Sequence, residues 1–159
     1  MIKYFIFLIL VISNSACTHK PMQLILENHD GSIVMSIKNV SEKDILLNQR
    51  LGLNSEITFN IVDKNGVNFT FQGDGLPCHG FEKYLKILKP GMTISQEVLI
   101  THLGELFHLK SDVQYRIKAK YKNRCWIKKG VFDGSLESNW VTFEGNGGPF
   151  GMDPLIDGY

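Results

Sequence analysis

Apolar and polar residues alternate with a period of two along much of the chain between residues 23 and 143. The clearest run spans residues 113–122. One set of positions in it is apolar, namely Val113, Tyr115, Ile117, Ala119 and Tyr121, and the other is polar, namely Gln114, Arg116, Lys118, Lys120 and Lys122. Alternate side chains of a β-strand point to opposite faces of its sheet. The run therefore predicts a half-buried strand with a basic outer face.

Shorter runs and turn signals predict the rest of an all-β fold. The predicted strands are residues 23–27, 32–38, 45–47, 56–62, 67–71, 84–88, 93–100 and 138–143, with one helical turn at 103–107 and a long loop at 123–136. Asp30-Gly31 and Asn65-Gly66 suit tight hairpin turns, and Pro90-Gly91 suits a type II turn. Short strands joined by such turns predict an antiparallel β-sandwich of about 7–9 strands.

The N-terminus has the order of a secretory signal. Lys3 precedes an apolar run at residues 5–12, and small or polar residues follow at 13–16. The eight apolar residues would rise only ~12 Å as a helix, against a hydrocarbon core of ~30 Å. We therefore expect residues 1–16 to be a signal peptide and not a membrane-spanning anchor.

Cys17 follows Ala16 directly, and the segment resembles a lipobox, in which this cysteine becomes acylated, for example with palmitate. Asn14 departs from the aliphatic residue usual there, and the alternative is simple cleavage after Ala16. Two or three acyl chains hold a protein stably on a membrane. Thr18, rather than Asp, follows the cysteine, which by resemblance to Gram-negative sorting favours the outer membrane, facing the periplasm. We expect a tether at 17–22, a sandwich domain at 23–144 and a Gly-rich C-terminal tail at 145–159.

Two cysteines remain, Cys78 and Cys125. An exported compartment permits disulfides, so we predict a bridge between them, worth ~4 kcal/mol in the chain-entropy account. The alternative is two free, buried thiols. A soft metal held by Cys78, His79 and Cys125 is the less favoured interpretation.

Three segments together resemble a known domain: residues 88–95, a turn before a strand; residues 109–121, in which Tyr115 resembles a tyrosine corner; and residues 138–143, a closing strand. Over roughly residues 31–143 the chain is similar to the immunoglobulin-like β-sandwich that precedes the catalytic domain of deuterolysin-type metallopeptidases, and to the small bacterial proteinase-inhibitor sandwich. The resemblance implies an immunoglobulin-like fold with structural roles for Gly91, Tyr115, Ser138 and Asn139.

Catalytic motifs are absent from the sequence. It contains no His-Glu-x-x-His, no Gly-x-Ser-x-Gly, no phosphate loop and no Cys-x-x-Cys. His102 and His108 lack zinc-ligand spacing and are expected at the surface. We therefore expect no enzyme activity, no cofactor and no metal site. We also expect no nucleic-acid partner, although the formal charge of +1 argues neither for nor against one.

Charge is segregated along the chain. Residues 110–130 contain eight Lys or Arg and one acid, Asp112, whereas residues 131–159 contain five acids and no base. Arg116, Lys118, Lys120 and Lys122, with Trp126 as a loop contact, could attract an anionic partner such as lipid headgroups, glycan phosphates or an acidic protein. The alternatives are a solvated face that prevents edge pairing, an acidic segment folded across the row, and Trp126 packing on the disulfide.

These observations predict a lipid-anchored, periplasm-facing binding module for a protein or envelope polymer. An inhibitor or immunity-type role is one version of this hypothesis, by analogy with the proteinase-inhibitor sandwich. The alternative is a structural accessory lipoprotein of an envelope assembly, without catalytic activity.

Overall fold

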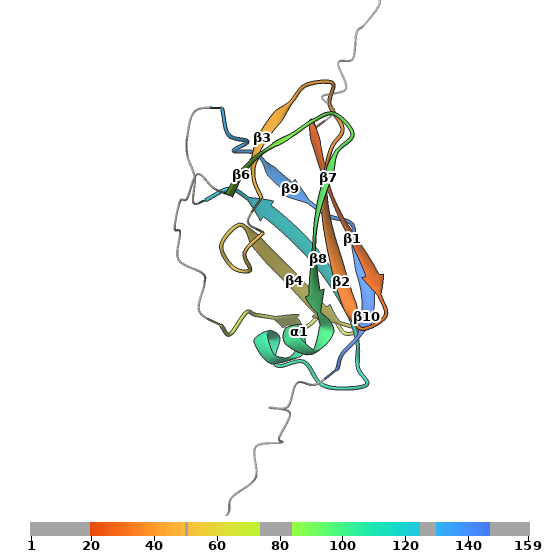
Figure 1. Cartoon of the computed structure of the whole chain (residues 1–159). Helices are drawn as coiled ribbons and strands as arrows, with labels where there is room; N and C mark the ends of the chain where they lie inside the picture. Colours follow the sequence, from red (N-terminus) through yellow and green to blue (C-terminus); the bar gives the residue numbers. More distant parts are fainter. Residues whose placement is uncertain (1–19, 50, 74–83, 125–129, 147–159) are drawn as a thin grey trace, which may run out of the picture.

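The computed structural model describes residues 20–49, 51–73, 84–124 and 130–146. Within these ranges the chain forms ten β-strands and one helix, packed as an all-β sandwich (Figure 1). The predicted fold class is thereby confirmed. The strand that was not predicted is β9 (Ser135–Glu137), and the strand predicted at residues 67–71 is the shorter β5 (Asn68–Phe69).

The first sheet has three antiparallel strands in the order β1 (Met22–His29), β2 (Ser32–Asn39) and β7 (Thr93–Leu99). The β1–β2 hairpin turns at Asp30-Gly31, as predicted, and Gly31 has φ +80°. A side chain with a Cβ rarely adopts such an angle, which explains the glycine. β7 forms one edge of this sheet.

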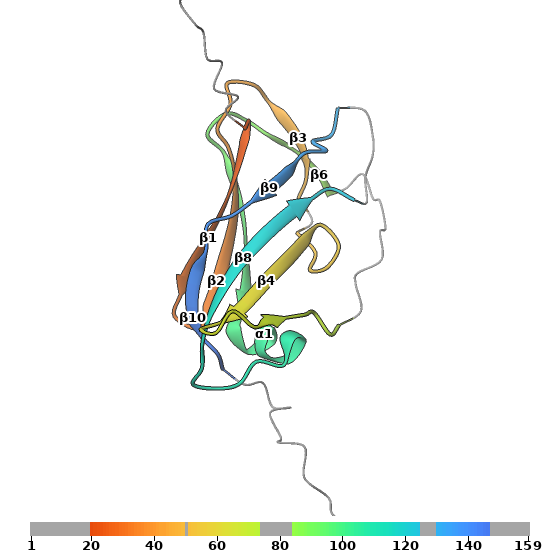
Figure 2. The same ribbon diagram turned by 180° about the vertical axis from the view of Figure 1, so that it is seen from behind.

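The second sheet has the order β10 (Val141–Glu144), β8 (Gln114–Lys122), β4 (Ile57–Asp63) and β5, and β9 pairs with the far end of β8 (Figure 2). A separate antiparallel pair, β3 (Ile45–Asn48) and β6 (Leu85–Leu88), lies at the end of the sandwich where β1 begins. All the strand pairs are antiparallel.

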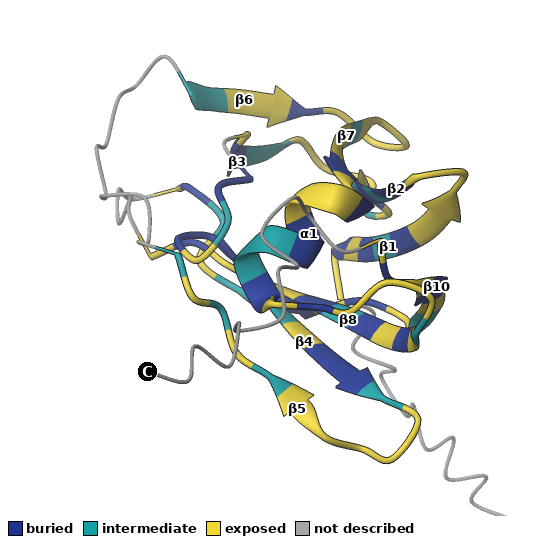
Figure 3. Cartoon of the chain, turned by 90° about the horizontal axis from the view of Figure 1, so that it is seen from below, coloured by how far each residue is buried: buried dark blue, intermediate teal, exposed yellow. Residues whose placement is uncertain are grey.

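The core lies between the two sheets and follows the predicted alternation. In β8 the inward residues Tyr115, Ile117, Ala119 and Tyr121 are buried, and the outward residues alternate with them. β1 and β2 contribute Leu24, Leu26, Ile33, Met35 and Ile37 from the other sheet. Figure 3, coloured by burial, shows buried and more exposed positions alternating along strands such as β1 and β8. Apolar burial of this kind is the main favourable term in folding.

Three local predictions were wrong. The strand expected to reach residue 100 ends at Leu99, and α1 (Ile100–Phe107) is longer than one turn, because Ile100, Leu103 and Phe107 bury one helical face. β9 lies inside the expected loop at 123–136. β10 begins at Val141 rather than at residue 138, because the side chains of Ser138 and Asn139 bond the backbones of β8 and β1.

Several sequence predictions fall outside the described residues. These are the signal peptide, Cys17, the Cys78–Cys125 bridge and Trp126. The tether is described only from Lys20, and β1 begins at Met22, one residue before the expected domain start. None of the described helices has the length and hydrophobicity needed to cross a bilayer.

The strands give the sandwich two ends. β1 runs beside β10 and in the same direction, because the Leu26 N–H donates to Asn139 Oδ1 at 3.0 Å and the Asn28 side-chain amide donates to the Thr142 carbonyl at 2.9 Å. β10 is antiparallel to β8, so β1 begins where β8 finishes. We call this the N-terminal end; it also holds the β6–β7 turn. The opposite α1 end holds the helix and the β1–β2 turn (Figure 1).

Candidate functional site

The basic row predicted from the sequence exists on the outer face of β8. Arg116, Lys120 and Lys122 are exposed and Lys118 is half-buried. Thr58 and Asn60 of β4 lie opposite Lys120 and Lys118, and Thr142 of β10 lies opposite Arg116. The predicted placement of the four cations on one face is therefore confirmed.

Glu137 of β9 neutralises the middle of this row. Its carboxylate accepts a hydrogen bond from Lys118 Nζ at 2.7 Å and lies 3.8 Å from Lys120 Nζ. The hydrogen bond and the charge of Lys118 hold the pKa of Glu137 below its usual range. The acid comes from the segment after residue 131, so part of the acidic region does lie across the basic row.

A tryptophan that the sequence argument passed over also lies on this face. Trp140 is 41% exposed, with the Arg116 guanidinium 5.3 Å and Lys118 Nζ 6.0 Å from its ring centroid. These are cation–π distances. Trp140 lies two residues before the outward-facing Thr142, so the period of two already placed both side chains on the same face. Glu137 and Trp140 thus contact three of the four cations, Arg116, Lys118 and Lys120.

Two of the structural residues carried over from the resemblance behave as expected. The Tyr115 hydroxyl accepts the Lys110 N–H at 2.9 Å, which is the upstream contact of a tyrosine corner. Gly91 has φ +76°, and Met92 N–H bonds the Lys89 carbonyl across the turn at 3.0 Å, as a type II turn requires.

Ser138 and Asn139 lie in the link between β9 and β10, not in the last strand. Ser138 Oγ accepts a hydrogen bond from the Ala119 N–H at 2.9 Å, so a side-chain oxygen takes the place of a backbone carbonyl beside β8. Asn139 Oδ1 accepts from Leu26 N–H, and its Nδ2 donates to the Leu26 carbonyl, each at 3.0 Å. These bonds interrupt the ladder, and Asn139 fastens the second sheet to the edge of β1.

A buried carboxylate lies near the N-terminal end. Glu56 is 2% exposed and accepts from Asn48 Nδ2 at 3.0 Å and from Ser55 Oγ. The neighbouring Tyr121 hydroxyl is buried without a hydrogen-bond partner, and burial raises its pKa. These hydrogen bonds join β3 to the start of β4.

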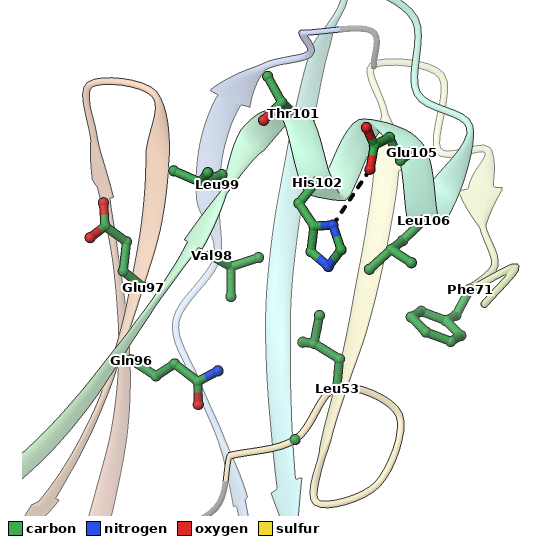
Figure 4. A pocket seen from close by; sticks show the side chains of 11 residues that line it. Leu53, Phe71, Gln96, Glu97, Val98, Leu99, Thr101, His102, Glu105 and Leu106 are labelled. Atoms are coloured by element: carbon green, nitrogen blue, oxygen red, sulfur yellow. Dashed lines mark ion pairs between the residues drawn. The ribbon is translucent and has the colours of Figure 1, made fainter. Parts of the chain in front are cut away.

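A groove of about 630 Å³ lies at the α1 end on the open side between the two sheets (Figure 4). Its apolar lining comes from three separate segments and includes Leu53, Phe71, Val98, Leu99 and Leu106. The Gln72 N–H bonds the Leu106 carbonyl at 2.8 Å, and this bond holds Phe71 beside α1. No sequence periodicity could have brought these segments together.

Carboxylates stand at the rim of this groove. Glu97 comes from β7 and Glu105 from α1, and both line it. His102 Nδ1 lies 3.6 Å from a Glu105 oxygen, the pair drawn with a dashed line in Figure 4. Glu97 and His102 are exposed to solvent. The groove is thus apolar inside and acidic at its edge.

The backbone of β7 borders the groove. Ile100 N–H bonds the Gly31 carbonyl and Asn39 N–H bonds the Met92 carbonyl, each at 3.0 Å. Antiparallel pairs alternate, so residues 94, 96 and 98 direct their backbone groups at β2, and residues 95, 97 and 99 direct theirs outward. No described strand pairs with that outer edge.

Metal-binding geometry is absent from the described part of the chain, where no three His, Cys, Asp or Glu side chains are placed to hold an ion. Searches against protein-family models and against curated proteins found no match to the chain. The arrangement of residues therefore carries the functional argument by itself.

Proposed function

We propose that this chain is a lipid-anchored, periplasm-facing binding module with an immunoglobulin-like sandwich, and that it holds an extended segment of a partner protein in the groove beside α1. Acylation of Cys17 supplies the anchor. The observation that carries the proposal is the groove itself, an apolar cleft bordered by an unpaired strand edge.

The unpaired edge favours an extended partner. A peptide laid along β7 would receive hydrogen bonds from the outward N–H and carbonyl groups of residues 95, 97 and 99. An added strand of this kind takes its affinity from the backbone and its specificity from alternate side chains. Val98 and Leu106 offer a place for one large apolar side chain.

The charges at the rim favour a basic segment. Glu97 and Glu105 flank the apolar lining, and none of the described residues that line this groove is Lys or Arg. A partner segment with Lys or Arg within two residues of an apolar anchor fits this pattern. Complementary charge of this kind steers association and selects the partner.

The test is photocrosslinking in cells of the native host. A photoreactive amino acid at Leu106, in the groove, should capture a partner that the same group at Val67, exposed elsewhere at the α1 end, does not. Synthetic peptides tiled from the captured protein are then titrated against the purified mature chain. We expect one peptide with an apolar residue next to a cation to bind.

Matched variants separate the two sources of affinity. Glu97→Gln and Glu105→Gln should each weaken the peptide about fivefold, since an exposed charge pair contributes up to ~1 kcal/mol. Glu97→Pro should weaken it further, because proline removes the outward N–H without breaking the β2–β7 ladder. Glu144→Gln, at the same end but outside the groove, is the control. Equal effects of all the variants, or a bound peptide without a cation, would contradict the proposal.

A further inference from the structure

The charges of the sandwich are segregated between its two ends. Among the described residues, the loops and strand ends at the N-terminal end carry six exposed cations and four carboxylates, the exposed Glu42, Asp44 and Asp133 and the buried Glu56. The cations are Lys20, Lys38, Lys43, Lys89, Lys122 and Arg124. They come from five separate segments that the fold gathers: the start of β1, the end of β2, the β2–β3 and β6–β7 connections, and the end of β8.

The α1 end has the opposite sign. Its carboxylates among the described residues are Asp30, Asp63, Glu97, Glu105, Asp112 and Glu144, and its cations there are Lys64, Lys110 and Arg116. The described residues as a whole contain as many acids as cations, so the net charge of the chain conceals this separation. A membrane or a partner meets one end at a time and therefore responds to the local charge.

The basic end also exposes apolar side chains. Val40 is 49% exposed, Ile87 56% and Met92 41%. Val40 N–H bonds the Pro21 carbonyl and Asn39 N–H bonds the Met92 carbonyl, so Val40 and Met92 lie beside the start of β1. Exposed apolar groups surrounded by lysine are the composition of surfaces that enter the headgroup layer of a bilayer.

The chain itself brings this end to a membrane. Cys17 precedes Lys20 by three residues, a span of at most ~11 Å when extended. An acyl group at Cys17 would therefore hold the N-terminal end within that distance of the lipid. A longer tether would leave the orientation of the domain open, whereas this one allows only the N-terminal end to touch.

We propose that the N-terminal end is a membrane-docking surface for anionic headgroups, with Val40 and Met92 entering the interface and the surrounding lysines meeting the lipid phosphates. This inference rests on the acylation of Cys17 proposed above. It fixes the orientation of the domain, with the groove beside α1 turned away from the membrane and toward other proteins.

The test uses the mature chain from Thr18, which lacks the acyl group and keeps every described residue. It is mixed with vesicles of phosphatidylcholine, and with vesicles in which phosphatidylglycerol replaces about a third of that lipid. We expect sedimentation with the anionic vesicles alone, weakened by salt, because charges near the surface are screened within a Debye length. Equal binding to both vesicle types, or to neither, overturns the proposal.

Variants at the two ends provide the matched comparison. Lys89→Gln with Lys122→Gln should weaken vesicle binding about 25-fold, since each cation near an anionic surface contributes a factor of about five. Lys64→Gln with Lys110→Gln changes the net charge equally and should leave binding unchanged. Val40→Ser with Met92→Ser should weaken it at least about tenfold, and Val67→Ser should not, because only the first pair loses apolar area at the lipid. Equal losses in the two lysine pairs would show that net charge, not this end, binds the vesicle.

Mass spectrometry of Cys17 separates this inference from the anchor. An acylated Cys17 in a chain whose unacylated form ignores anionic vesicles overturns the docking surface and leaves the anchor standing. An unmodified Cys17 in a chain that binds these vesicles through Lys89 and Lys122 supports the surface and removes the anchor. The groove variants at Glu97 and Glu105 should not change vesicle binding in either case.

Discussion

The two ends of the sandwich differ in charge, in closure and in the residues that hold them. The N-terminal end is basic, and its connections are tied by the buried side chain of Asn39. The α1 end is acidic and keeps a groove of about 630 Å³ and an unpaired strand edge. About 30 Å separates the ends, the length of a nine-residue strand such as β8.

The difference shows how one small domain can serve two surfaces. An end whose connections are braced by buried hydrogen bonds suits contact with a flat bilayer. An open end suits an incoming chain, because backbone donors and acceptors are already exposed there. Both ends depend on the same core, so each prediction below tests whether one end can change without the other.

The largest expected effect is at Asn39. Its side chain donates to the Leu88 and Lys43 carbonyls and accepts from Ser41 N–H and Oγ. Asn39→Ala leaves buried carbonyls without partners and should lower the free energy of unfolding by about 3 kcal/mol. Urea denaturation measures this. Asn60→Ala, exposed on β4, should stay within about 0.5 kcal/mol, and a similar loss at both sites would mean that the network does not brace this end.

At the α1 end, Tyr115 braces a connection as Asn39 does at the other end, but through a single hydrogen bond. Tyr115→Phe removes the acceptor of the Lys110 N–H and should cost about 1 kcal/mol. Hydrogen exchange should speed up at the Lys110 amide and remain unchanged at the Asn39 amide. Faster exchange at both would show that the ends are not independent.

One turn glycine lies at each end of the sandwich, so the same substitution can be made at both ends and its effect on stability compared. Gly31 and Gly91 have φ +80° and +76°, and nothing lies within 4 Å of a Cβ built on either. Gly31→Ala and Gly91→Ala should therefore each cost about 1 kcal/mol, from backbone strain alone. Thermal unfolding measures both. A much larger loss at one site would reveal a contact that the turn geometry does not require.

The smallest effect concerns Glu137, which lies midway between the ends. Lys118 lowers its pKa in the folded state, so the ion pair stabilises the fold above the ordinary glutamate pKa and is lost as pH falls through the lowered value. Glu137→Gln should lower the melting temperature slightly at neutral pH, with the two proteins converging in acid. Added salt should also reduce the difference in melting temperature between the two proteins. A difference that persists in acid would contradict the ion pair.

Much of the fold could be predicted because it depends on local sequence patterns. The alternation at residues 113–122 identified the inward and outward faces of β8, and Gly31 and Gly91 marked turns that need positive φ. β9 was missed because three residues are too few to show a period. The start of β10 was misplaced because Asn139 bonds a strand more than a hundred residues away.

The sequence by itself determined the strands, their buried faces, their tight turns and the basic row on β8, since each depends on neighbours within a few residues. Only the tertiary structure decided that Glu137 would pair with the middle of that row, that three separate segments would line a groove, and that the charges would divide between two ends. Those features arise from the pairing of distant strands, which brings residues together in space without leaving a periodic trace along the chain.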